Sequence, residues 1–168
     1  MKIFLIGFMG SGKSYWGRRW AERYGLPFID LDQQVEEREH ETIAAVFEKK
    51  GEAYFRETET SCLRGFSQHE SFIMACGGGV PCFHDNIQWM NEQGTTVYLA
   101  ADPPLLLERL IHEKDKRPLL KELDHPALLS FIENKLSERS VFYNQAKLVL
   151  PVNELNENSL SQLVTINQ

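Results

Sequence analysis

The most constraining feature of the chain is the octapeptide Gly-Phe-Met-Gly-Ser-Gly-Lys-Ser at residues 7–14, which fits the pattern G-x-x-x-x-G-K-[ST]. It follows the apolar run 3–6 and precedes a helical spacing of apolar residues over 16–24. A loop of this kind directs backbone N–H groups and the positive end of a helix dipole at an anion. Lys13 would reach the terminal phosphates of a nucleotide, and Ser14 would offer a hydroxyl to Mg²⁺. The octapeptide therefore predicts a nucleotide-binding strand–loop–helix unit, with a chance Gly-rich turn as the alternative.

The composition limits the chain to one domain without an extended basic surface. Of its 168 residues 42% are apolar, enough for one sizeable core. Its 18 Lys and Arg against 24 Asp and Glu give a net charge of −6, which disfavours nucleic acid and anionic membranes as partners. Cys62, Cys76 and Cys82 are odd in number and lack metal-ligand spacing, which is typical of a reducing compartment. The first apolar run is too short for a signal segment, and no later run reaches membrane-spanning length. We expect a cytoplasmic monomer.

Short apolar runs alternate with helical patterns along the chain, which predicts parallel strands joined by crossover helices. The expected strands are 2–6, 27–31, 71–76, 95–99 and 147–150. The expected helices are 14–24, 42–50, 52–67, 84–93, 104–112, 126–145 and 159–166. The pattern predicts a single α/β domain over residues 1–168.

Residues 112–125 interrupt this alternation. The stretch is polar and charged and has no periodic apolar pattern. A long segment of this kind inside a compact domain is commonly functional. We expect it to be a mobile lid over the binding site.

Two carboxylates alternate at the end of the second expected strand, Asp30 and Asp32. Ligands of open parallel sheets lie beyond the carboxyl ends of the strands, so both should flank the same crevice as the phosphate loop. Alternation along a strand would point them to opposite faces, one toward a metal ion and one toward a substrate hydroxyl. A helix N-cap at Asp32 or a solvated strand end is the alternative.

Three arginines and a run of glycines complete the candidate residues. Arg56, Arg117 and Arg139 could each be a surface ion-pair partner, but such a pair contributes only about 0–1 kcal/mol and does not require arginine. A carboxylate or phosphate ligand does require it. The glycines 77–79 directly follow the third expected strand, where backbone without side chains could approach a small ligand, or could simply form a flexible turn.

Taken together in this order and spacing, these motifs resemble the shikimate kinases over nearly the whole chain. The phosphate loop alone identifies only a very large superfamily, whereas the motifs in series are specific. They are Gly7 to Ser14, Asp30-Leu31-Asp32, Gly51-Glu52-x-x-Phe55-Arg56-x-x-Glu59, Gly77-Gly78-Gly79, Arg117-Pro118-Leu119-Leu120 and Glu138-Arg139-x-x-x-Tyr143.

The resemblance implies a three-layer, nucleoside-monophosphate-kinase-like α/β fold around the phosphate loop, with a five-stranded parallel sheet. It implies a substrate-binding helical segment at about 32–62 and a mobile lid at about 112–125. The implied reaction is transfer of the γ-phosphate of ATP to the 3-hydroxyl of shikimate, giving shikimate 3-phosphate and ADP on the route to chorismate and aromatic amino acids. Mg²⁺ is the implied cofactor.

On the ATP side, the resemblance implies that Ser14 ligates Mg²⁺ directly and that Asp30 holds the ion through water. Lys13 and Arg117 would act catalytically on the phosphates, with Arg117 closing together with the lid. Arg109 would lie against the adenine. The implied ATP-binding set is Gly10, Ser11, Gly12, Lys13, Ser14, Tyr15, Arg109 and Arg117.

On the substrate side, the resemblance implies that Asp32 is catalytic, as base or orienter of the acceptor hydroxyl. Arg56 and Arg139 would hold the substrate carboxylate, Glu59 would orient Arg56, and Gly78 would donate a backbone N–H. The implied substrate-binding set is Asp32, Arg56, Glu59, Gly77, Gly78, Gly79 and Arg139.

Two alternatives stay open at this point. Gluconate-type and nucleoside monophosphate kinases share the loop, the sheet and a lid, but would not be expected to combine Arg56, residues 77–79 and Arg139 in this register. A non-catalytic kinase-like binding protein would lose Lys13 or Asp32, and both are present.

Overall fold

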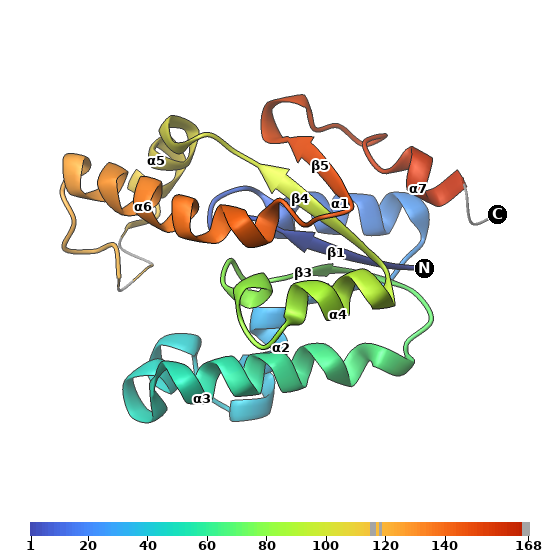
Figure 1. Ribbon diagram of the computed structural model, residues 1–168, viewed down its shortest axis with the longest axis horizontal. Coiled ribbons are helices and arrows are strands. Elements are labelled where there is room, and N and C mark those ends of the chain that lie inside the picture. The colour runs from blue at the N-terminus through green and yellow to red at the C-terminus, as the bar shows by residue number, and fades with distance from the viewer. Residues whose placement is uncertain (115–116, 118, 166–168) are drawn as a thin grey trace.

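The protein is built on one parallel sheet that runs through the centre of the computed structural model (Figure 1), which describes residues 1–114, 117 and 119–165. The strands are β1 (Lys2–Ile6), β2 (Phe28–Asp30), β3 (Phe72–Ala75), β4 (Thr95–Ala100) and β5 (Leu148–Pro151). They pair in the order β2-β3-β1-β4-β5, and every pairing is parallel. The predicted five-stranded parallel α/β fold is confirmed.

Helices connect these strands and cover both faces of the sheet. The α-helices are α1 (Lys13–Tyr24), α2 (Leu31–Glu39), α3 (Ile43–Gly65), α4 (Asn86–Gln93), α5 (Pro103–Ile111), α6 (His125–Tyr143) and α7 (Ser161–Thr165). Short 3-10 helices occupy Phe66–Gln68, Val80–Cys82 and Val152–Glu154.

The alternation of side chains along β1 creates the two faces of the core. Phe4 and Ile6 belong to a buried cluster with residues of α2, α3, α4 and α6. Ile3 and Leu5 point the opposite way and belong to a cluster with α1 and the C-terminal segment. Because both faces are covered, residues 3–6 of β1 are all apolar and fully buried, and only Lys2 at the start of the strand is partly exposed.

A third apolar cluster lies beyond the sheet, where α5 and α6 pack together. Leu106 of α5 and Leu128 of α6 are fully buried there, together with Phe8 of the loop after β1. Leu120, within the predicted lid, is also fully buried in this cluster. The described part of residues 112–125 is therefore attached to the α5–α6 pair.

The main departure from the expected elements lies just after β2. Helix α2 was not expected as a separate helix, because Leu31 and Val35 are its only buried residues and the rest of its sequence is polar. The predicted break between two helices at Gly51 is confirmed locally, since its φ of 83° and ψ of 170° interrupt the helical backbone within α3.

The structure also corrects the interpretation of the paired aspartates. Strand β2 ends at Asp30, and Asp32 lies in the first turn of α2 rather than two positions along a strand. The helix N-cap is Asp30, whose Oδ1 accepts from the backbone N–H of Gln33 at 3.4 Å. Strand alternation therefore does not orient the two carboxylates, and the cap proposed for Asp32 belongs to Asp30.

A tight approach between β1 and the start of β4 leads to a prediction of stability. A Cβ at Gly94 would collide with the backbone carbonyl of Lys2, which cannot move without disturbing the sheet. Gly94→Ala should lower the free energy of unfolding by about 1–3 kcal/mol. Gly65→Ala is the matched control, since a Cβ there meets nothing within 4 Å and should raise it by about 0.5–1 kcal/mol. Equal urea-unfolding midpoints for both variants would contradict the prediction.

Candidate active site

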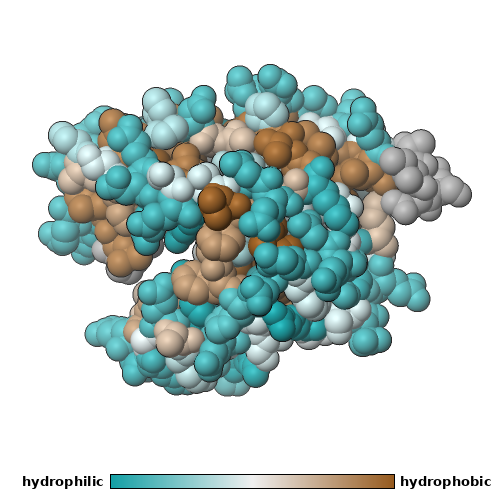
Figure 2. All heavy atoms as spheres, in the orientation of Figure 1, coloured by the Kyte–Doolittle hydropathy of each residue, from teal (hydrophilic) through white to brown (hydrophobic). Residues whose placement is uncertain are grey.

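A cleft of about 820 Å³ opens at the carboxyl ends of the strands. Figure 2 shows it as a hollow between the part built on α5 and α6 and the part built on α3. Of the site residues predicted from sequence, Ser11 alone does not line it. All the other predicted site residues line the cleft, and they are Gly10, Gly12, Lys13, Ser14, Tyr15, Asp30, Asp32, Arg56, Glu59, Gly77, Gly78, Gly79, Arg109, Arg117 and Arg139. Ser11 is fully buried, and its Oγ has no hydrogen-bond partner.

The phosphate loop takes its shape from glycines at positions that side chains rarely tolerate. Gly10 and Gly12 have φ angles of 82° and 93°, and Gly12 is the N-cap of α1. No side chain caps the helix there, so its first backbone N–H groups are left for a ligand. This is the anion-binding geometry that the octapeptide predicts.

Lys13 folds back onto its own loop. Its Nζ donates to the carbonyl oxygens of Gly7 and Phe8 at 2.8 and 2.9 Å. Withdrawal from water lowers the pKa of Lys13 to about 8, although the negative charge of Asp32 opposes the shift. The charged ammonium group is thus less well stabilised than it would be in water, and an added anion would raise its pKa again.

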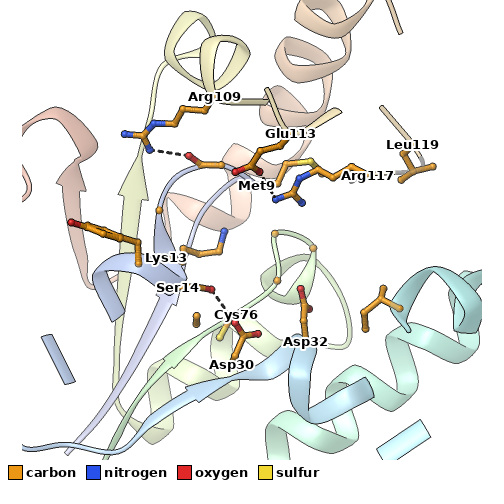
Figure 3. Close-up of a pocket in the computed structure, with 18 of the residues that line it drawn as sticks. Met9, Lys13, Ser14, Asp30, Asp32, Cys76, Arg109, Glu113, Arg117 and Leu119 are labelled. Carbon is orange, nitrogen blue, oxygen red and sulfur yellow. Dashed lines mark hydrogen bonds and ion pairs between the residues drawn. The ribbon is translucent and has the colours of Figure 1, made fainter. Parts of the chain in front are cut away.

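Ser14 and Asp30 come together from different elements and form the hydrogen bond drawn in Figure 3. The hydroxyl at the start of α1 donates to Oδ2 of the carboxylate at the end of β2, at 2.9 Å. A hydroxyl beside a carboxylate is a pair of hard oxygen ligands suited to Mg²⁺. No cluster of three or more His, Cys, Asp or Glu that could hold a metal ion occurs among the described residues.

Asp32 lies in the cleft close to both the phosphate loop and the glycine run. Burial raises the pKa of its carboxyl group, and the nearby negative charge of Asp30 adds to the shift. The positive charges of Lys13 and Arg117 oppose it. A carboxylate whose proton affinity is raised in this way is a better general base for a hydroxyl.

The glycines 77–79 form a wall against which three charged side chains lie. A Cβ at the first would be 3.0 Å from Oδ1 of Asp32, and a Cβ at the second would be 2.8 Å from Nη1 of Arg139. A Cβ at the third would be 2.5 Å from Nη1 of Arg56. Side chains at these positions would displace all three charged groups, so the run is more than a flexible turn.

Arg56 is held from several sides. Its Nη1 donates to Oε1 of Glu59 at 3.0 Å, and both side chains are almost fully buried. Its guanidinium lies 4.4 Å from the ring centroid of Phe83 and 5.1 Å from that of Phe55. Burial raises the pKa of Glu59 to about 7, even though Arg56 favours its charged form. The pairing of Glu59 with Arg56 agrees with the expectation that it orients the arginine.

Arg139 reaches the same wall from α6. Its guanidinium lies 5.6 Å from the ring centroid of Phe8, and the hydroxyl of Tyr143, one turn further along, donates to the carbonyl of Gly78 at 2.6 Å. Sequence reasoning assigned no role to Phe8, Phe83 or Tyr143. The i, i+4 spacing of Arg139 and Tyr143 was a usable signal, whereas nothing in the sequence linked Phe83 to Arg56.

The upper edge of the cleft carries two more arginines, labelled in Figure 3. Arg109 of α5 donates to the carbonyl of Gly10 at 2.9 Å, which ties the phosphate loop to this helix. Arg117 pairs with Glu113 at 3.3 Å, and both side chains are partly exposed. Leu119 lines the cleft while 74% exposed. Positions 115, 116 and 118 of the predicted lid lie outside the described residues.

Comparisons with known proteins agree with this arrangement. A family model described as shikimate kinase matches residues 9–166. A curated shikimate kinase of Bacteroides thetaiotaomicron is 41% identical over 157 residues, which cover 94% of this chain and 90% of that one.

Solved structures give the same result. The crystal structure of shikimate kinase from B. thetaiotaomicron superposes with a TM-score of 0.89 at 39% identity, covering 100% of this chain and 96% of the other. A shikimate kinase from Acinetobacter baumannii in complex with shikimate gives a TM-score of 0.81 at 30% identity, covering 99% and 89%.

The raised pKa of Glu59 predicts a pH dependence of stability. The folded state holds this proton up to about pH 7, whereas the unfolded chain releases it near the ordinary value of 4.5. Stability should therefore fall as the pH rises from about 4.5 to about 7, by on the order of 3 kcal/mol from this group. Glu59→Gln should remove most of that slope.

Urea unfolding at intervals from pH 4.5 to 8 measures the effect. Glu57→Gln, two residues away with an exposed side chain, is the control and should leave the slope unchanged. If Glu59→Gln and the parent protein have parallel stability profiles, the carboxyl group of Glu59 is not what titrates.

Proposed function

The chain belongs to the shikimate kinase family, and we propose that its cleft transfers the γ-phosphate of ATP to the 3-hydroxyl of shikimate. As a member of this family, the protein is a kinase that uses ATP and phosphorylates a hydroxyl group of shikimate. Membership decides against the gluconate-type and nucleoside monophosphate kinase families. The roles of individual residues in the reaction are part of the proposal.

One observation carries the proposal: Asp32, Arg56 and Arg139 converge on the glycine wall at 77–79, in the same cleft as the phosphate loop. Two arginines from different helices suit a small carboxylate, because each can form charge-assisted, bidentate hydrogen bonds with it. A polyhydroxylated acid offers little apolar area, so these bonds supply most of its affinity. The wall would add backbone N–H groups, with Gly78 as the donor we propose.

On the donor side, we propose that the first N–H groups of α1, with Gly10, Gly12, Ser14 and Tyr15, bind the ATP phosphates. Ser11 would contribute only through its backbone, since its side chain is buried beneath the loop. Lys13 would leave the carbonyls that it contacts and pair with the phosphates. This exchange is favourable because the ammonium is poorly accommodated where it lies.

Ser14 and Asp30 fit Mg²⁺. This ion usually takes one or two protein oxygens and fills its shell with phosphate oxygens and water, which agrees with the absence of a larger ligand cluster among the described residues. Bound there, Mg²⁺ would neutralise charge that builds up on the phosphates. We propose Ser14 as the direct ligand and Asp30 as a ligand through water.

We propose that Asp32 accepts the hydrogen bond of the 3-hydroxyl, orients it in line with the γ-phosphate and takes its proton. Its raised pKa supports this role, since proton transfer to it costs less than to an ordinary carboxylate. Arg117 would add positive charge at the transferred group. Phosphoryl transfer of this kind depends mainly on positioning and electrostatics, which these residues can supply.

We propose that the chain is one kinase domain, with a substrate-binding helical segment at about 32–62 and a lid at about 112–125. Arg117 and Leu119 support the lid, because both line the cleft while Arg117 is partly exposed and Leu119 largely exposed to water. Closure would exclude water from the γ-phosphate.

We also propose that the protein works as a cytoplasmic monomer. Cys62, Cys76 and Cys82 are free thiols, as a reducing compartment allows. No helix among the described residues is long and apolar enough to cross a membrane.

A panel of acceptors tests the proposal. ADP release in the presence of ATP and Mg²⁺ should be stimulated by shikimate and not by gluconate, nucleoside monophosphates or buffer alone. Stimulation by another acceptor would keep the phosphate-loop chemistry and overturn the carboxylate site. ATP binding without turnover on any acceptor would favour a non-catalytic, kinase-like protein.

Substitution of the arginine from α6 tests the carboxylate site. Arg139→Lys should raise the KM for shikimate by on the order of tenfold, with a smaller change in kcat, because an ammonium cannot form the bidentate bonds. Arg64→Lys is the control, since Arg64 is exposed and contacts the carbonyl of His84 away from the cleft. An unchanged KM for Arg139→Lys would remove this residue from the site.

A further inference from the structure

The cleft has a second end, away from the arginines that face the glycine wall. Its lining there includes Tyr15 and Trp16 of α1, Arg109 of α5 and Val152 after β5. An aromatic pair and an aliphatic side chain suit a flat, uncharged ring, and a guanidinium can stack on the face of such a ring.

Trp16 is placed firmly at this end. Its ring stacks on that of Trp20, with centroids 5.4 Å apart and planes inclined by 26°, and meets the ring of Tyr15 edge-on at 5.4 Å. Trp20 is fully buried, and its Nε1 donates to the carbonyl of Asn156 at 2.9 Å. The indole of Trp16 therefore rests on a fixed base while part of it stays open to the cleft.

Trp16 and Arg109 border the same small space above the phosphate loop. A Cβ at Gly12 would lie 3.4 Å from Cδ1 of Trp16 and 3.7 Å from Nη1 of Arg109. The guanidinium is itself fixed, since it donates to the carbonyl of Gly10. Glycine leaves this space free for a ligand atom.

The direction of the nucleotide follows from the order of residues along α1. Its terminal phosphate must face Asp32 and the acceptor, so the other phosphates follow the helix start toward Ser14 and Tyr15. The nucleoside then emerges at Trp16. We propose that the indole of Trp16 forms one wall of the base site, packing against the purine ring that Arg109 contacts from the other side.

This inference rests on the proposed use of ATP, and it adds Trp16 to the residues that determine how tightly the nucleotide binds. Aromatic stacking on a base is tolerant of sequence and strengthens with ring area, so purine nucleotides should be favoured over pyrimidine ones. The contacts to the phosphates do not depend on this stacking. Trp16 should therefore affect nucleotides and leave inorganic phosphates almost untouched.

Calorimetric binding of ADP and of inorganic triphosphate to the full-length protein tests the inference. Trp16→Leu should weaken ADP roughly tenfold while changing triphosphate binding by less than about twofold. Trp16→Phe should keep ADP affinity within about threefold, because a ring is retained. Trp89→Phe is the control, since Trp89 packs against Phe4 outside the cleft and should change neither ligand.

The outcomes separate the possibilities. Equal weakening of ADP and triphosphate by Trp16→Leu would mean that Trp16 only supports the loop, and unchanged ADP affinity would remove it from the base site. Either result overturns the inference. Shikimate-dependent turnover by the unmodified protein, measured in parallel, tests the proposed function separately. If turnover is absent but Trp16→Leu still weakens only ADP binding, the proposed function is overturned and the role of Trp16 stands.

Discussion

The close approach of charged side chains to the backbone of residues 77–79 is the constraint on which the cleft depends. Asp32, Arg56 and Arg139 come from three different helices, and each occupies space that a Cβ on this run would need. One residue separates the run from the end of β3, which pairs with β1 and β2. The strand therefore holds the wall in register with the phosphate loop after β1 and with Asp30 at the end of β2. Glycine at these positions therefore lets the charged side chains of the proposed acceptor site lie close to the phosphate loop.

Burying these charged groups costs free energy of folding, and the protein without a ligand retains that cost. Burial pushes the pKa of Asp32 and Glu59 up and that of Lys13 down, each away from its charged form. Such sites store unfavourable electrostatics that a bound ligand of the right charge relieves. Phosphates would relieve Lys13, and a carboxylate would share the two arginines. Lys13, which lowers the stability of the free protein, thus favours an anion in the cleft.

Sequence reasoning located the strands, the loop and most of the lining because these depend on local patterns. Apolar runs and the octapeptide have fixed spacing, so β1 was predicted to the residue. The role of Asp30 as cap was missed because the cap and its neighbour Asp32 look alike in sequence, and only the end of β2 distinguishes them. The packing of Phe83 on Arg56 depends on how α3 meets the segment after β3, which no local pattern encodes.

The ion pair between Arg117 and Glu113 bears on how the proposed lid would work. Both side chains are partly exposed to water, and a surface pair contributes only about 0–1 kcal/mol. Arg117 can therefore exchange Glu113 for a phosphate at little cost, and the exchange gains strength as water leaves the cleft. Leu119, 74% exposed at the cleft, would lose water at the same step. If the proposed lid closes, burial of Leu119 would favour closure whichever anion is present, whereas Arg117 would respond to phosphate. A filled donor site would then favour closure more than an empty one.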